Sequence, residues 1–251
     1  MIKVRAQRAA KGYGDAGGAA ESRHSDQWPG GGMADSERLR QMMVERQIAR
    51  RGVGDPRLLA AMRQVPRENF VPEELRDFAY EDRPLPVEGG QTISQPYIVA
   101  RMIEAAAIRA SDRVLEIGVG SGYAAAVMSR LAAHVFAIDR LGELAALARG
   151  RMERLGYDNL SIRTGDGTEG WPEQAPFDAI LVAAGGPSVP PPLREQLTIG
   201  GRLVIPVGEA REQQLMRITR TGEEAFETQK LEAVRFVPLI GAHGWHDTKA
   251  R

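Results

Sequence analysis

The sequence predicts an α/β protein with a doubly wound, mostly parallel sheet, N-terminal helices and C-terminal edge strands. From about residue 95 to residue 208, short apolar runs alternate with segments of helical periodicity, which indicates strands joined by helical crossovers. Such crossovers place helices on both faces of the sheet. After Gly208 two strand-like runs follow without a helix, and we expect them to join one edge in antiparallel orientation.

The part that precedes the alternation is predicted to be helical. A helix is expected over residues 35–52, where Asp35 can cap its start and Gly52 can end it. Asp55 followed by Pro56 is typical of a second helix start, because proline fits the first turn. Several prolines then divide the chain into short pieces.

The alternating part gives the remaining elements in order. We expect helices over 96–108, 122–132, 141–155 and 192–197, strands over 113–117, 134–138, 160–163, 177–183 and 202–207, and edge strands over 213–220 and 231–239.

The composition excludes several classes of function. Lys plus Arg and Asp plus Glu both number 33, so the formal charge is zero, which disfavours a nucleic-acid-wrapping protein. There is no cysteine, which excludes disulfide scaffolds, thiol catalysis and iron–sulfur clusters. The four histidines are scattered, so no metal site is expected, and no apolar run approaches the length of a membrane span.

The two ends of the chain differ from the rest. Residues 1–34 are rich in glycine and alanine and are expected to form a disordered tail, with Met33 as a candidate start residue. The basic residues at the beginning of this tail are also compatible with an organelle transit peptide, but no apolar signal-peptide core follows them. Residues 242–251 are expected to form a flexible C-terminus.

A glycine-rich loop follows the first predicted parallel strand. Gly118, Gly120 and Gly122 allow a tight turn and a close approach of the backbone to a ligand. The dinucleotide fingerprint GxGxxG would need its third glycine at position 123, where this chain has Tyr123, so a pyrophosphate site is disfavoured.

Three acidic residues lie at the carboxyl ends of predicted strands. Glu116, just before the glycine loop, would repel phosphates but suit a cationic ligand. Asp139 ends the next strand, where a carboxylate can accept hydrogen bonds from both ribose hydroxyls, and Asp166 follows the third strand at the expected adenine edge. A nucleoside with a positive, phosphate-free tail fits this set, so we predict S-adenosylmethionine as the cofactor.

Residues 111–208 resemble the class I methyltransferases, and a longer match points to one family among them. The string Gln91-Thr-Ile-Ser-Gln-Pro96, the glycine loop and Glu232-Ala-Val-Arg-Phe-Val-Pro-Leu239 are similar to the protein-L-isoaspartate O-methyltransferase family. The similarity covers nearly all of residues 37–240. It departs from the usual bacterial pattern at Glu88-Gly-Gly90, just before the Gln91 string.

The resemblance implies roles for individual residues. Ser94 matches the active-site serine of the family. The positions implied to bind the cofactor, or to line the cofactor and peptide pocket, are Gln91, Thr92, Ile93, Glu116, Gly118, Gly120, Gly122, Asp139, Arg140, Asp166 and Gly167. From local sequence alone, Ser94 is equally a natural helix N-cap, and the two roles are compatible.

The resemblance also implies a domain organisation and an activity. Residues 35–95 would form a helical cap and substrate-site loop, and residues 96–241 a Rossmann-like methyltransferase domain with added edge strands. The reaction would be methyl transfer from S-adenosylmethionine to the free carboxylate of L-isoaspartyl residues, which starts repair of damaged proteins through a succinimide. We expect a cytoplasmic monomer that acts on isoaspartyl proteins and peptides without nucleic acid or membrane.

The residue inventory suits a carboxylate acceptor. A carboxyl group with a pKa of about 3.9 is already ionised at neutral pH and needs no general base. Two alternatives stay open: a methyltransferase for another carboxylate, and a cofactor-binding module without catalysis. A nicotinamide oxidoreductase is disfavoured by Tyr123 and Glu116.

Overall fold

A seven-stranded sheet forms the centre of the protein in the computed structural model, which describes residues 33–209 and 211–247. The order across the sheet, with bounds, is β5 (Leu160–Thr164), β4 (His134–Asp139), β3 (Arg113–Ile117), β6 (Phe177–Val182), β7 (Leu197–Glu209), β8 (Glu212–Arg220) and β9 (Phe226–Val234). The strands from β5 to β7 are parallel to their neighbours, and β8 and β9 are antiparallel. The predicted fold class is confirmed.

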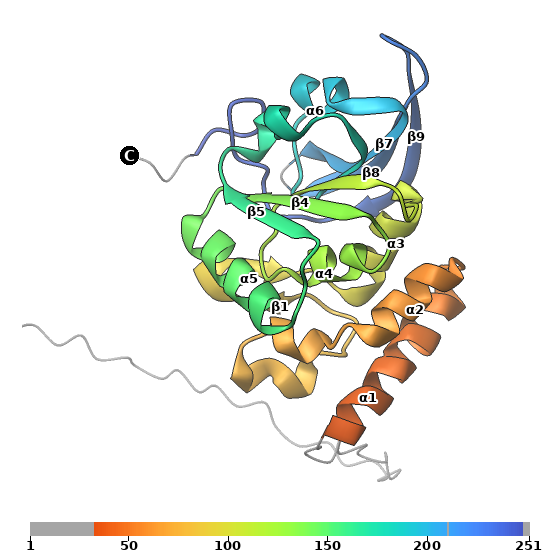
Figure 1. Cartoon of the computed structure of the whole chain (residues 1–251), viewed down its shortest axis with the longest axis vertical. Coiled ribbons are helices and arrows are strands. Elements are labelled where there is room, and N and C mark those ends of the chain that lie inside the picture. The colour runs from red at the N-terminus through yellow and green to blue at the C-terminus, as the bar shows by residue number, and fades with distance from the viewer. Residues whose placement is uncertain (1–32, 210, 248–251) are drawn as a thin grey trace, which may run out of the picture. The chain divides into compact units, whose positions relative to one another are not determined.

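Helices of ordinary length flank the sheet or precede it (Figure 1). They are α1 (Met33–Met42), α2 (Pro56–Gln64), α3 (Pro96–Ala106), α4 (Tyr123–Ser129), α5 (Gly142–Arg154) and α6 (Pro191–Glu195). Shorter helical turns are η1 (Met43–Ile48), η2 (Ala49–Arg51), η3 (Arg67–Phe70), η4 (Glu73–Phe78), η5 (Glu88–Gly90), η6 (Gly167–Glu169) and η7 (Pro172–Gln174), and β1 (Leu85–Pro86) pairs with β2 (Thr92–Ile93).

Local signals set the end of the first helix and the start of the second as predicted, but α1 begins at Met33, so the predicted cap Asp35 lies within its first turn. Helix α1 continues through η1 and η2 until Gly52, which adopts a φ of 96° that favours glycine. Helix α2 begins after Asp55, whose side chain accepts a hydrogen bond from the Arg57 backbone N–H at 2.9 Å.

Side chains that alternate along the strands form two hydrophobic cores. Val114 packs into a core that also contains Met43, Ile48 and Met62 from the N-terminal helices. Leu115 faces the opposite side, where α6 covers the sheet (Figure 1). The N-terminal helices and the sheet therefore share one core within the unit Gly31–Arg251, which is compact by its contacts.

The second edge strand was predicted over residues 231–239, and this position is wrong. Strand β9 ends at Val234, and the chain then leaves the sheet. The Gln213 side chain accepts a hydrogen bond from Phe236 N at 2.8 Å, and Val237 accepts one from Gly185 N at 2.8 Å. Pro238 has no N–H to donate to a strand neighbour, so the ladder cannot continue through it.

The predicted tail lies outside the described residues, apart from its last two positions, and so does the end of the predicted flexible C-terminus. Residues 242–247 are described, and Ala242 N donates to the Asp166 carboxylate at 2.7 Å. Over the described ranges, the helices are too short or too polar to traverse a lipid bilayer.

Candidate active site

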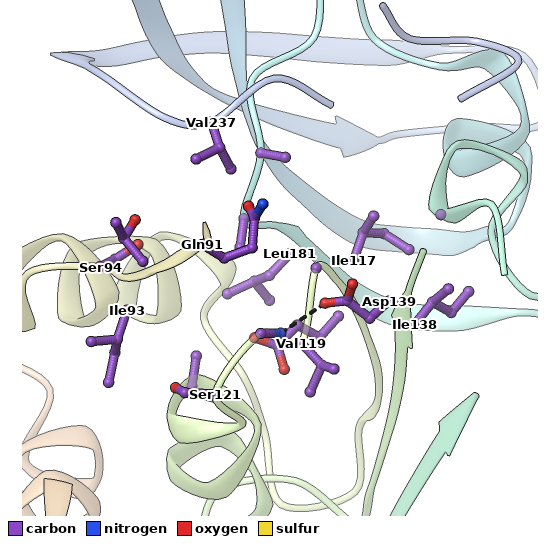
Figure 2. Close-up of a pocket in the computed structure, with 18 of the residues that line it drawn as sticks. Gln91, Ile93, Ser94, Ile117, Val119, Ser121, Ile138, Asp139, Leu181 and Val237 are labelled. Carbon is purple, nitrogen blue, oxygen red and sulfur yellow. Dashed lines mark hydrogen bonds between the residues drawn. The ribbon is translucent and has the colours of Figure 1, made fainter. Parts of the chain in front are cut away.

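A pocket opens at the carboxyl ends of β3, β4 and β6, where the strand order reverses (Figure 2). Parallel α/β sheets bind their ligands at this point because the connections to the two neighbouring strands run in opposite directions. The space free of atoms in it is about 1060 Å³, counting the solvent at its mouth.

The glycine loop, residues 118–122, forms one wall. Gly118 has a φ of 87°, and its N–H donates to the Ile138 carbonyl at 2.8 Å, which fixes the loop to β4. Gly122 also has a positive φ, and a β-carbon there would overlap the methyl group of Met152 on α5. The positive φ values favour glycine at both positions.

Asp139 organises the loop from the end of β4. Its carboxylate is 7% exposed and accepts hydrogen bonds from Gly120 N at 2.9 Å and Leu141 N at 3.0 Å, one on each oxygen. A carboxylate oxygen has two lone pairs, so each oxygen can still accept a hydroxyl. The side chain is held in place before any ligand arrives.

Glu116 lines the pocket as a buried carboxylate without a hydrogen-bond partner. Its side chain is 2% exposed, and Oε2 has no partner among the described residues. Burial, with a contribution from the Asp139 charge, raises the pKa of the Glu116 carboxyl well above its ordinary value. A cationic group in the pocket would give Oε2 a partner and lower the pKa of the Glu116 carboxyl again. This end of the site therefore favours a positive ligand.

The acceptor loop, residues 88–95, forms the opposite wall. Gln91, Thr92, Ile93 and Ser94 all line the pocket (Figure 2). The N-cap of α3 is Gln95, without a side-chain cap, so the N-cap reading of Ser94 is wrong. Pro96 occupies the first helical position, so the helix begins one residue later than an N-cap at Ser94 would require. The half-buried Ser94 hydroxyl makes no hydrogen bond with any described residue, and it is available to a ligand.

Arg151 joins the two loops. From α5, its Nη1 donates to the Ser121 carbonyl of the glycine loop at 2.8 Å, and its Nη2 donates to Glu88 Oε1 of the acceptor loop at 3.2 Å. The buried guanidinium therefore links the start of the acceptor loop to the glycine loop.

The structure brings most of the predicted positions together, with two exceptions. Arg140 and Gly167 line the same pocket as Gly118 and Gly120, whereas Gly122 and Asp166 are not part of its lining. The Asp166 carboxylate instead accepts hydrogen bonds from Thr168 and Ala242. Its contact with adenine stays a prediction.

Sequence reasoning missed a third wall. Residues Val237, Pro238, Leu239 and Ile240 line the pocket after the chain leaves β9, and Val237 faces the space above Ser94 (Figure 2). Hydrogen bonds from Gly185 N to Val237 O and from Leu239 N to Gly185 O hold this segment, both at 2.8 Å. The signal that could have revealed it is Pro238 inside a predicted strand.

Known proteins resemble this chain over almost the whole of the described region. The family model for protein-L-isoaspartate(D-aspartate) O-methyltransferase matches residues 37–244. Protein-L-isoaspartate O-methyltransferase 2 of Pelobacter propionicus is 58% identical over 85% of this chain and 95% of its own length. The protein-L-isoaspartate O-methyltransferase of Rhodopseudomonas palustris is 59% identical over 81% and 94%.

Solved structures agree with the sequence relatives. A protein-L-isoaspartate O-methyltransferase superposes with a TM-score of 0.72 at 31% identity, over 83% of this chain and 67% of that one. A Plasmodium falciparum structure assigned to the same activity, in complex with S-adenosyl-L-homocysteine, has a TM-score of 0.69 at 27% identity, over 80% and 98%. The chain belongs to the protein-L-isoaspartate(D-aspartate) O-methyltransferase family.

Proposed function

We propose that this protein transfers the methyl group of S-adenosylmethionine to the free carboxylate of L-isoaspartyl residues in damaged proteins. One observation carries the proposal: a single pocket contains the glycine loop with Asp139 on one side and the Ser94 hydroxyl on the other. Membership of the family agrees with it. The product ester closes to a succinimide, which reopens in part to normal aspartate and so starts repair.

The residues of the pocket fit S-adenosylmethionine. A positive ligand such as that molecule would stabilise the ionised form of the Glu116 carboxyl, whose Oε2 has no partner among the described residues, whereas a pyrophosphate would disfavour it. Asp139 would hold the ribose, with Arg140 beside it. We assign the adenine contacts to Gly167 and, still as a prediction, to Asp166. When bound, the cofactor supplies a methyl group activated by the sulfonium.

The chain's own residues then need to bind and orient the acceptor. The described lining contains no histidine, lysine or cysteine, and its carboxylates, Glu116 and Asp139, belong to the glycine-loop side that we assign to the cofactor. An isoaspartyl carboxylate is ionised at neutral pH and needs no general base. Ser94 would donate a hydrogen bond to one carboxylate oxygen and leave the other to attack. Alignment of this kind lowers a barrier by about 7–11 kcal/mol at best.

The proposed function is tested with two synthetic peptides of the same sequence. One contains an L-isoaspartyl residue, and the other contains a normal aspartyl residue at the same position. We expect radiolabelled methyl groups from S-adenosylmethionine to appear as base-labile esters on the isoaspartyl peptide, and at background level on its normal aspartyl twin. Equal labelling of both peptides would indicate a general carboxylate methyltransferase. Cofactor binding without any labelling would indicate a module that has lost catalysis.

Ser94→Ala is expected to slow transfer to the isoaspartyl peptide and to leave cofactor affinity near that of the wild type. A hydrogen bond to a charged group contributes about 1.5–3 kcal/mol, which corresponds to a roughly 10- to 150-fold loss in kcat/KM. Steady-state kinetics and calorimetric titration of the cofactor measure the two effects. Ser161→Ala, on β5 away from the pocket, is the control. A collapse of cofactor binding in Ser94→Ala would contradict the assignment.

A further inference from the structure

Arg67 is a fully buried guanidinium that contacts three separate parts of the site's framework. It lies in η3 and is 0% exposed. Its Nε donates to the Ala79 carbonyl and its Nη2 to the Ser94 carbonyl, both at 2.8 Å. The guanidinium also lies over the ring of Tyr123, 4.8 Å from its centroid, directly after the glycine loop.

This burial is costly, and the charge of Asp82, which forms no ion pair with Arg67, offsets it only in part among the described residues. Among the described residues Arg67 forms no ion pair, since its hydrogen-bond partners are two neutral carbonyls. Burial lowers the pKa of the Arg67 guanidinium to about 10, so it remains charged at neutral pH. A buried charge is tolerated where its hydrogen bonds hold something that an apolar side chain could not.

The Ser94 carbonyl is the group that needs such a donor. It lies between β2 and α3, outside the β1–β2 ladder, and the first N–H groups of α3, those of Ile98 and Val99, donate to the Gln95 carbonyl instead. In the described part of the chain, Arg67 is its hydrogen-bond donor, reaching across 27 positions. Ser94 and Tyr123 both line the pocket.

We propose that Arg67 is a positioning residue that fixes the end of the acceptor loop against the glycine loop, so that the Ser94 hydroxyl faces the acceptor carboxylate. This inference rests on the proposed function. Arg67 itself is absent from the pocket lining and acts through Ser94. Together with Arg151 at the start of the loop, it sets the distance between the two walls on which methyl transfer depends.

The planar fork of arginine explains why this residue type is needed. Two donors on one rigid group serve two carbonyls at once, whereas the lysine ammonium is a single centre on a flexible stem. In Arg67→Lys we expect a shift of the acceptor loop. A displacement of about 1 Å can cost on the order of 100-fold in rate, so kcat/KM for the isoaspartyl peptide should fall by about that factor. The cofactor dissociation constant should change by less than about threefold.

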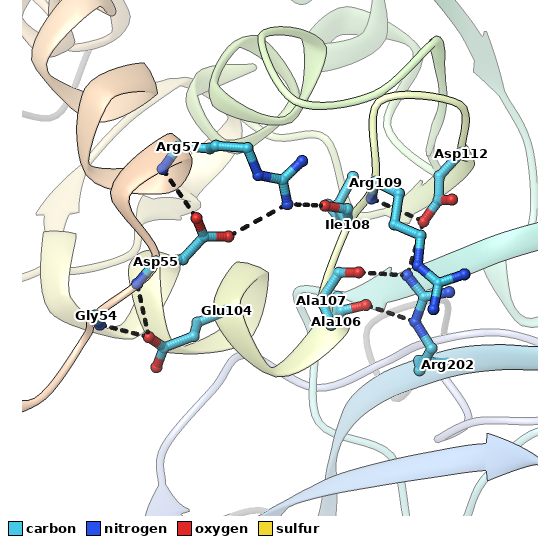
Figure 3. Close-up of polar contacts among 10 residues, drawn as sticks. All are labelled: Gly54, Asp55, Arg57, Glu104, Ala106, Ala107, Ile108, Arg109, Asp112 and Arg202. Atoms are coloured by element: carbon cyan, nitrogen blue, oxygen red, sulfur yellow. Dashed lines mark hydrogen bonds and ion pairs between the residues drawn. The ribbon is translucent and has the colours of Figure 1, made fainter.

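The chain offers a matched control in Arg202 (Figure 3). This second buried arginine also donates to two backbone carbonyls, from Nε to Ala106 and from Nη2 to Ala107, both at 2.7 Å, and differs from Arg67 in its ion pair with Asp112. It contacts the far end of α3 and does not line the pocket. Arg202→Lys should also lower the unfolding midpoint, because it disturbs a buried guanidinium, but its peptide kinetics should stay near those of the wild type.

A double-mutant cycle separates positioning from general stability. If Arg67 acts through Ser94, the Arg67→Lys/Ser94→Ala protein should be only about threefold slower than Ser94→Ala alone, because the group being positioned is already gone. If Arg67 supports only the fold, the two rate losses should multiply. Multiplicative losses, or equal kinetic defects in Arg67→Lys and Arg202→Lys, would overturn the proposal.

A second variant covers the case in which Arg67→Lys does not fold. Arg67→Gln removes the buried charge, keeps one donor and should show the same kinetic pattern. Amide hydrogen exchange of residues 91–95 gives a readout independent of activity: we expect faster exchange in either Arg67 variant than in Arg202→Lys, and unchanged exchange would contradict the proposal. A wild-type protein that fails to label the isoaspartyl peptide would refute the proposed function instead, and the exchange data would still decide whether Arg67 holds the loop.

Discussion

Asp139→Ala is expected to bind S-adenosylmethionine roughly 100- to 1000-fold more weakly than the wild-type protein, a loss of about 3–4 kcal/mol from two hydrogen bonds to a charged acceptor. The substitution would remove the proposed acceptor of both ribose hydroxyls. It also frees Gly120 N and Leu141 N, which the carboxylate holds in the structure. The glycine loop would then lose part of its organisation before the ligand binds.

Calorimetric titration of the cofactor measures this effect directly. Glu143→Ala is the control, because Glu143 is an exposed carboxylate in the first turn of α5, only four residues away. The cofactor affinity of Glu143→Ala should match that of the wild type. This result would exclude a general effect of negative charge near the site. Cofactor affinity that is unchanged in Asp139→Ala would refute the assignment of Asp139 to the ribose.

Asp112→Ala is expected to cause the largest loss of stability, about 3–5 kcal/mol in the free energy of unfolding. Asp112 and Arg202 form a buried ion pair at 2.7 Å, with exposures of 4% and 6% (Figure 3). Removal of the carboxylate leaves the Arg202 charge buried without its partner. It also removes the acceptor of the Arg109 N–H at 3.0 Å.

Urea denaturation monitored by circular dichroism measures the difference. Glu173→Ala provides the contrast, because Glu173 pairs with Arg163 at 3.2 Å on the surface, where a pair contributes about 0–1 kcal/mol. Asp112→Asn keeps an acceptor for Arg109 N and should lose less than Asp112→Ala. A loss below about 1 kcal/mol in Asp112→Ala would mean that water replaces the carboxylate in this core.

The sequence predicted those parts of the protein whose signals are local. The alternation of apolar runs and helical segments predicted β3 to β7 with their crossovers, and Asp55 before Pro56 predicted the start of α2. Both follow from residues next to one another in the chain. The glycine loop could be placed for the same reason, since the strand before it and the helix after it are its neighbours.

Features that depend on distant contacts could not be predicted. The edge strand was misplaced because the bonds of Gly185 and Gln213 with residues 236–239 decide where the chain leaves the sheet. The orientation of Asp166 depends on Ala242, 76 positions further on. The N-cap reading of Ser94 failed by one residue, and the pairing of its carbonyl with Arg67 has no signature in either local sequence.

The segment Val237–Ile240 has a consequence for the order in which the protein matures during synthesis. The pocket takes its walls from residues as early as Gln91 and as late as Ile240, about 150 positions further on. A ribosome-bound chain can form the sheet from β3 to β7 while this last wall is still unmade, since chains fold progressively from the N-terminus. The nascent polypeptide would thus remain without a complete ligand chamber until residues 237–240 have left the ribosome.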